Sequence, residues 1–142
     1  MKVIPRFLKL CVGALLAGLV TVAHSGVVPL DFETHTDDYD YVSQQMLNEL
    51  KASLGRSAEV RQTRGRERYV RIIVHTLPPS QDNQIAYAVV WLAMGPQGEQ
   101  CQQGCYLNSI VGRAGNLVAD RAGQRIASDT LGIIRAISQH FP

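Results

Sequence analysis

The sequence predicts an α+β fold, in which two helices pack on one face of an antiparallel meander sheet of three to five strands. Residues 37–54 and 117–140 each carry one apolar stripe at three- and four-residue spacing, as amphipathic helices do. Residues 57–94 are rich in β-branched and aromatic side chains and are interrupted by turn sequences. Short connections between these strands favour a two-layer sandwich.

The first 25 residues have the pattern of a bacterial secretory signal peptide. Three basic residues precede an uncharged, mostly apolar stretch over 10–23, and Ala23-His24-Ser25 is a small-x-small cleavage site. A helix over that stretch would rise about 21 Å, which is short of the roughly 30 Å core of a bilayer. We therefore expect cleavage near Ser25 and Gly26, leaving residues 26–142 as one small periplasmic or secreted domain.

The charge balance of the processed chain argues against a nucleic-acid binder. The sequence has 14 Lys and Arg and 12 Asp and Glu, but three of the basic residues lie before residue 10. All 12 acidic residues follow residue 25, so the processed chain would carry 11 basic side chains and a net charge of −1. A protein that binds nucleic acid through its backbone would show a clear excess of positive charge.

The N-terminal elements are a strand followed by a helix. Residues 26–34 alternate apolar and polar side chains and could form a first strand at the sheet. Thr36 is the expected N-cap of the helix over 37–54. Asp37 and Asp38 would then lie in the first turn, where the helix dipole favours negative charge.

Four further strands are expected. They cover 57–62, 68–77, 84–94 and 106–111, and only the first is weakly patterned. The segment 84–94 is the most apolar of the processed chain, so it should be a central strand that is covered on both faces or nearly so.

The last strand should lead directly into the second helix. We expect a turn over 112–115, with Asn116 as the N-cap of the helix over 117–140. Glycines in such a turn can leave backbone N–H groups free for an anion, although a tight turn alone also explains them. Gly123 and Gly132 each weaken the helix by roughly 1 kcal/mol relative to alanine, which predicts close packing on the sheet.

Cys101 and Cys105 are the only cysteines after residue 25. Two cysteines in an oxidising compartment most simply form a disulfide, here one that staples a loop between strands. The alternative is a redox pair or a copper(I) site, for which thiolates are suitable ligands and His75 is a candidate third ligand. A redox pair is usually activated by a helix N-terminus, and a strand is expected to follow this pair instead.

An arginine-rich segment is the second candidate site. Its residues are Arg61, Arg64, Arg66, Arg68 and Arg71. The planar guanidinium group suits phosphate and carboxylate, so this hairpin could bind anionic lipid, lipopolysaccharide or an acidic protein surface. The other interpretation is that these charges protect a sheet edge from pairing with other chains.

No catalytic motif, metal-ligand spacing or cofactor fingerprint is present in the sequence. Trp91 and Tyr87 alternate on one face of the apolar strand and should belong to the core. We therefore expect an exported, non-catalytic protein that acts by protein–protein interaction in the bacterial envelope, without cofactor, metal or nucleic acid. The alternatives are a thiol or copper(I) carrier that uses the cysteine pair, and a binder of an anionic lipid or small molecule through the arginine hairpin.

Overall fold

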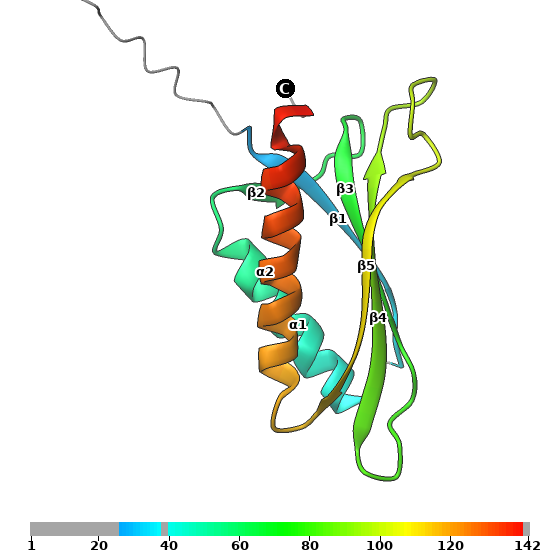
Figure 1. The fold of residues 1–142 in the computed structure, drawn as a ribbon, viewed down its shortest axis with the longest axis vertical. Coiled ribbons are helices and arrows are strands. Elements are labelled where there is room, and N and C mark those ends of the chain that lie inside the picture. The colour runs from blue at the N-terminus through cyan, green and yellow to red at the C-terminus, as the bar shows by residue number, and fades with distance from the viewer. Residues whose placement is uncertain (1–25, 38–39, 141–142) are drawn as a thin grey trace, which may run out of the picture.

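The computed structural model describes residues 26–37 and 40–140, which form a two-layer α+β sandwich (Figure 1). The predicted signal peptide lies outside these residues. The elements in chain order are β1 (Val28–His35), α1 (Tyr41–Gly55), β2 (Val60–Gln62), β3 (Tyr69–Thr76), β4 (Gln84–Met94), β5 (Cys105–Gly115), α2 (Ala119–Ile137) and a 3-10 turn (Ser138–His140).

The sheet is mixed, so the predicted antiparallel meander is only partly correct. Its strand order is β2-β1-β3-β4-β5, and β3, β4 and β5 are antiparallel neighbours as expected. The first strand, however, lies parallel to both β2 and β3, with Leu30 opposite Val70 and His35 opposite His75. The reason is α1, which returns the chain across the sheet in the crossover that parallel strands require.

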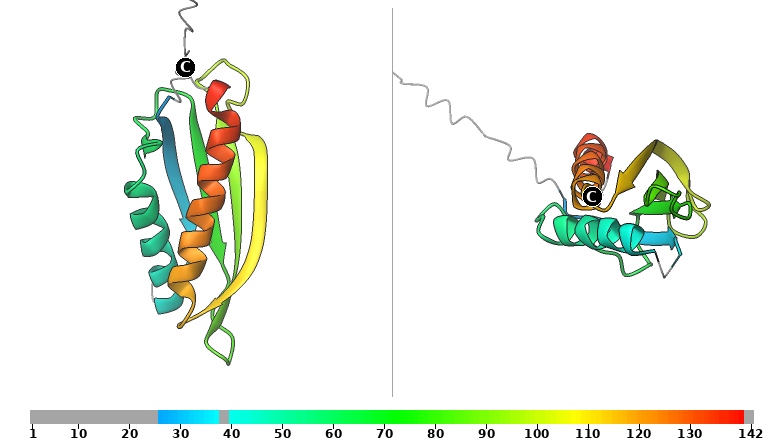
Figure 2. Two further views of the ribbon diagram at one scale, coloured as in Figure 1. Left: turned by 60° about the vertical axis from the view of Figure 1, so that its left-hand side comes forward. Right: turned by 90° about the horizontal axis from the view of Figure 1, so that it is seen from below.

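Both helices lie on the same face of the sheet, side by side, as predicted (Figure 2). Helix α1 begins at Tyr41 and not at residue 37, because Asp40 is its N-cap in place of Thr36. The Asp40 carboxylate accepts a hydrogen bond from the backbone N–H of Val42 at 3.0 Å and another from the Ser43 hydroxyl. A buried carboxylate with these two donors fixes where the helix starts.

Helix α2 begins two residues later than predicted because β5 is longer than predicted. Residues 112–115 continue the strand, with Gly115 opposite Gln84, and they do not form a turn before the helix. Val118 is consequently the N-cap and makes no side-chain cap bond, and Asn116 does not cap the helix. Gly112 lies opposite Tyr87 on β4, and an added Cβ would lie only 2.5 Å from the Tyr87 ring, so the space taken by this ring explains the glycine.

The core lies between the helices and the sheet, and a buried hydrogen bond between side chains crosses it. Trp91 is fully buried and its Nε1 donates a hydrogen bond to Oγ1 of Thr130 at 2.9 Å. The Thr130 hydroxyl in turn donates to the backbone carbonyl of Ile126 at 2.7 Å. This link joins α2 to β4. Trp91 and Tyr87 both lie in the core, as predicted.

Gly123 of α2 packs closely against α1, and not against the sheet as predicted. A Cβ added at Gly123 would lie 2.4 Å from the carbonyl oxygen of Met46 and 2.9 Å from the backbone nitrogen of Leu50. Gly132 has nothing within 4 Å of such a Cβ, so the predicted close packing is wrong for this glycine.

Candidate functional site

Within residues 26–37 and 40–140, no helix covers the second face of the sheet. Along β4 the residues Ile85, Tyr87, Val89 and Trp91 point toward the helices and are buried, so the residues between them point the other way. We call this second surface the open face. Strand register assigns to it Asp31, Glu33 and His35 of β1, Arg71, Ile73 and His75 of β3, Ala86, Ala88, Val90 and Leu92 of β4, and Tyr106, Ser109, Val111 and Arg113 of β5.

The charged groups on the β1 side of the open face are paired with one another. The Arg71 guanidinium donates to Asp31 at 3.0 Å, to Glu33 at 3.4 Å and to the Tyr69 hydroxyl at 3.0 Å. Glu33 also bonds to Nε2 of His35 at 2.8 Å, and the His35 ring stacks on His75 with centroids 4.3 Å apart. The hydrogen bond from His35, aided by the charge of Arg71, holds the pKa of Glu33 below its usual value.

The centre of the open face is apolar. Ala86, Ala88, Val90 and Leu92 are the outward residues of β4, and Ile73 lies opposite Val90 on β3. Strand β4 is therefore apolar on both faces, but the helices cover only one of them, so the prediction that both faces are covered is wrong. The outward side chains remain partly accessible.

A hollow of about 560 Å³ lies at the end of the open face that is nearer the β3–β4 hairpin. Its floor is formed by Ala86 and Ala88, whose small side chains leave space between β3 and β5. Its walls are His75 and Leu77 on one side and Val111 and Arg113 on the other. Leu77 is 65% exposed and Val111 is 83% exposed, so the hollow has apolar walls that stand in solvent.

The cysteine loop closes the other end of the open face. Cys101 and Cys105 form the predicted disulfide, with Cα atoms 4.9 Å apart. Within the ring, Gly104 has φ +96°, and an added Cβ would lie 3.1 Å from Cδ1 of Leu92 and 3.2 Å from Sδ of Met94. The loop is thus pressed against outward side chains of β4, and Met94 is only 9% exposed. The disulfide therefore shapes one border of the open face.

His75 does not approach the cysteine pair. It lies opposite Ala88 on β4, whereas Cys105 lies opposite Ala93, five residues further along the same strand. At about 3.4 Å per residue this separation is about 17 Å. Over 26–37 and 40–140, no group of three or more His, Cys, Asp or Glu side chains is arranged to hold a metal ion.

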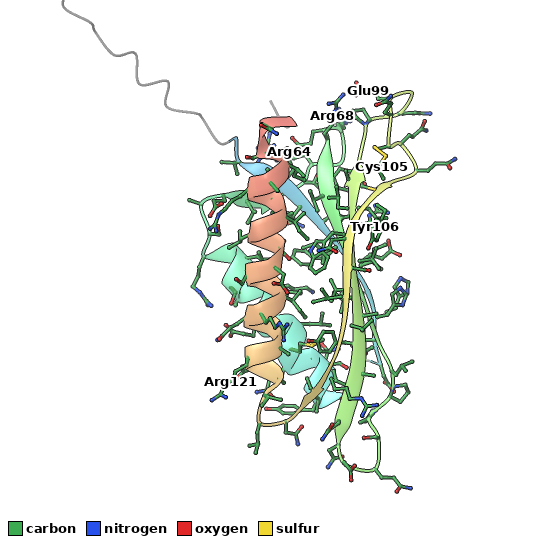
Figure 3. The ribbon with its side chains drawn as sticks, in the orientation of Figure 1. Arg64, Arg68, Glu99, Cys105, Tyr106 and Arg121 are labelled. Atoms are coloured by element: carbon green, nitrogen blue, oxygen red, sulfur yellow. A yellow bond between two sulfur atoms is a disulfide. The ribbon has the colours of Figure 1, made fainter. Side chains whose placement is uncertain are left out.

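Three of the five arginines predicted as a binding site are paired with carboxylates. Arg61 makes a two-pronged ion pair with Glu67, with one N–O distance of 2.7 Å. The hydrogen bonds from the Arg61 guanidinium, together with one from the backbone N–H of Arg64, lower the pKa of Glu67 to about 2. Arg68 donates to Glu99 at 2.7 Å, and this pair ties the start of β3 to the cysteine loop (Figure 3). Arg71 belongs to the open face.

The other two arginines form no ion pair among the described residues. Arg64 and Arg66 lie in the connection between β2 and β3, and neither guanidinium group has a side-chain partner within the described part of the chain. The prediction that this segment is a hairpin is wrong, because β2 and β3 lie on opposite sides of β1 and both run parallel to it. The segment offers two unpaired positive charges in place of five. The other three arginines form ion pairs within the fold, and β2 itself is only a three-residue edge strand.

Comparison of the sequence with protein-family models and with curated proteins finds no match. Among the described residues, neither α1 nor α2 is long and apolar enough to cross a membrane.

Sequence reasoning missed the residues that form the hollow, above all Arg113, Val111 and the two alanines. The sequence alone places Arg113 in a turn, because Gly112 and Gly115 have the spacing of a strand-to-helix connection. The sequence does contain a pattern that predicts the hollow. Small Ala86 and Ala88 alternate with large Ile85 and Tyr87, which places the small residues on one face of a central strand.

Proposed function

We propose that this protein is an exported, non-catalytic binding module that acts through contacts with another protein of the bacterial envelope, and that the open face is its docking surface. One observation carries the proposal. An antiparallel sheet with one solvated face normally alternates apolar and polar residues, whereas β4 turns apolar residues to both sides. The layer that would cover Val90 and Leu92 is supplied by a partner.

The surroundings of the apolar centre fit a protein interface. A typical interface has an apolar core inside a polar rim. Here the rim includes Tyr106, which is 65% exposed and bonds to Ser109 at 3.0 Å, and the Arg71 network on the other side. Because Asp31 and Glu33 already have cationic partners, covering the β1 side leaves no carboxylate unpaired.

Photo-crosslinking from two matched tyrosines tests the proposal. Tyr106 lies on the open face, and Tyr41, which is 70% exposed, lies at the start of α1. A photoreactive phenylalanine analogue is placed at each position in the full chain, and crosslinks are formed in the native envelope. We expect a discrete protein adduct from position 106 and none of the same mass from position 41.

A charge in the apolar centre provides the second arm of the test. Val90→Asp should abolish the adduct formed from position 106, because an unpaired carboxylate would be buried under the partner. Leu117→Asp is the control, since Leu117 is 97% exposed in the connection between β5 and α2. An adduct that survives Val90→Asp in a folded variant would overturn the docking surface, and substrate turnover by the purified domain would contradict the non-catalytic assignment.

A further inference from the structure

The hollow has a regular construction. Two rows of residues cross the sheet at this end, one formed by His75, Ala88 and Val111, and the next by Leu77, Ala86 and Arg113. In both rows a small alanine is flanked by larger side chains. The result is a trough along β4 whose floor is two methyl groups, and whose flanking strands are about 9.6 Å apart.

The chemistry of the trough is apolar with one positive charge at its rim. Arg113 is exposed, and its guanidinium group has no partner within the residues that the structure describes. None of the residues that line the hollow is acidic. The nearest carboxylate on the open face, Glu33, lies on β1 and is bonded to His35 and Arg71. Asp82, in the connection between β3 and β4, lines a neighbouring hollow together with Arg113, but no ion pair joins these two side chains among the described residues. A bound anion would therefore meet an Arg113 guanidinium that no ion pair holds.

We propose that this trough is a binding site for an anionic amphiphile, a molecule with a hydrocarbon chain and a carboxylate or phosphate head. The chain lies over Ala86 and Ala88 between Leu77 and Val111, where it removes apolar surface from water. The head group accepts hydrogen bonds from Arg113, whose planar fork suits both carboxylate and phosphate. A volume of about 560 Å³ lies within the usual range for small-molecule sites.

This inference goes beyond the proposed function and stands on a different observation. Protein docking rests on Val90, Leu92 and Tyr106, whereas the amphiphile site rests on the alanine floor and the free arginine. The two sites share the open face but not their essential residues. Arg113→Gln should therefore leave the adduct from position 106 unchanged, and failure of one proposal can be told apart from failure of the other.

Calorimetric titration with three probes tests the ligand class. The full processed chain is titrated with laurate, with dodecanol and with dodecyltrimethylammonium, each below the concentration at which it forms micelles. Laurate should bind more tightly than either of the others, because only its head group pairs with Arg113. Equal binding of all three, or no binding of laurate, would overturn the proposal.

Two substitutions and one control locate the site. Arg113→Gln should weaken laurate roughly tenfold, the effect of one charge-assisted hydrogen bond. Ala88→Leu should weaken laurate and dodecanol alike by filling the floor. Arg121→Gln, an exposed change on α2 away from the sheet, should alter neither affinity (Figure 3). Laurate binding that is unchanged in both folded site variants would overturn the assignment of the trough.

A vesicle arm separates the two sources of such a head group. Sedimentation is measured with phosphatidylcholine vesicles that contain or lack phosphatidylglycerol. Binding that needs phosphatidylglycerol and is lost in Arg113→Gln identifies a membrane lipid as the source. Laurate binding without vesicle binding identifies a free amphiphile, and failure of both arms overturns the proposal.

Discussion

The contact between the two helices at Gly123 allows a quantitative test of the packing. In Gly123→Ala, the new methyl group would lie 2.4 Å from the Met46 carbonyl oxygen and 2.9 Å from the Leu50 nitrogen. A comfortable carbon–oxygen contact is about 3.3 Å, so α1 and α2 would have to separate by roughly 0.9 Å. Both obstacles are backbone atoms, which a rotamer change cannot move.

The expected magnitude is the difference between two effects. Alanine gains roughly 1 kcal/mol over glycine in a helix interior. Overpacking of this kind costs about 1–3 kcal/mol, and a displaced helix backbone belongs at the upper end of that range. We therefore expect Gly123→Ala to lower the free energy of unfolding by about 1–2 kcal/mol.

Gly132→Ala is the matched control on the same helix. Nothing lies within 4 Å of its added Cβ, so only the helix propensity should act, and the free energy of unfolding should rise by roughly 1 kcal/mol. Urea unfolding followed by circular dichroism measures both variants, with the slope checked for two-state behaviour. If Gly123→Ala is as stabilising as Gly132→Ala, the helices do not touch at this point and the reasoning is refuted.

Three further predictions concern the core, the cysteine loop and pH. Thr130→Val should lower the free energy of unfolding by about 1–3 kcal/mol, because the buried Trp91 N–H loses its acceptor. Urea unfolding measures this change, and a loss below about 0.5 kcal/mol would contradict the hydrogen bond between Trp91 and Thr130. Replacing both Cys101 and Cys105 by serine should cost about 2 kcal/mol or less and should increase hydrogen exchange in the loop; unchanged exchange would show that the ring does not hold it. The folded pKa of Glu67, about 2, lies below its ordinary value of 4.5, so its ionised form adds stability above about pH 4.5 that is lost as pH falls toward 2. Glu67→Gln should reduce this acid loss in a pH series of thermal melts, and an identical series would disprove the stabilising role of the Arg61 pair.

The helices and the apolar strand were predictable because their signals are local. The stripes of α1 and α2 and the boundaries of β4 follow from side-chain periodicity, and β4 was predicted to its last residue. Helix starts were less accurate because several polar residues near residue 36 could cap the helix. In the structure the cap is Asp40, which is 6% exposed and whose carboxylate accepts from the Val42 N–H and the Ser43 hydroxyl.

The position of β1 was not predictable from periodicity, since it depends on pairing between distant segments. The order strand, helix, strand did contain the information, because a crossover helix of 15 residues is what parallel neighbours require. Weighting that order above the simplicity of a meander would have given the mixed sheet.

The candidate site was only partly predictable for a related reason. The arginine cluster is conspicuous in sequence, yet its charges are mostly satisfied by acids that are distant along the chain, such as Glu99 for Arg68. The open face, by contrast, becomes visible only when β3, β4 and β5 are placed side by side. A surface built from single residues on separate strands leaves no local motif.

The interior position of β1 also affects the order in which the sheet can assemble. The strands β3, β4 and β5 can pair through consecutive hairpins, whereas Asp31 and its partner Arg71 are 40 positions apart in the sequence. A chain made from its N-terminus therefore holds its first strand without a strand partner until α1 and β2 have been synthesised. Pairing over such separations is slow because the loop must close before any contact rewards it. The first strand to be made therefore waits for its first partner until Gln62 and for its second until Thr76, whereas β4 and β5 can each pair with the strand made just before.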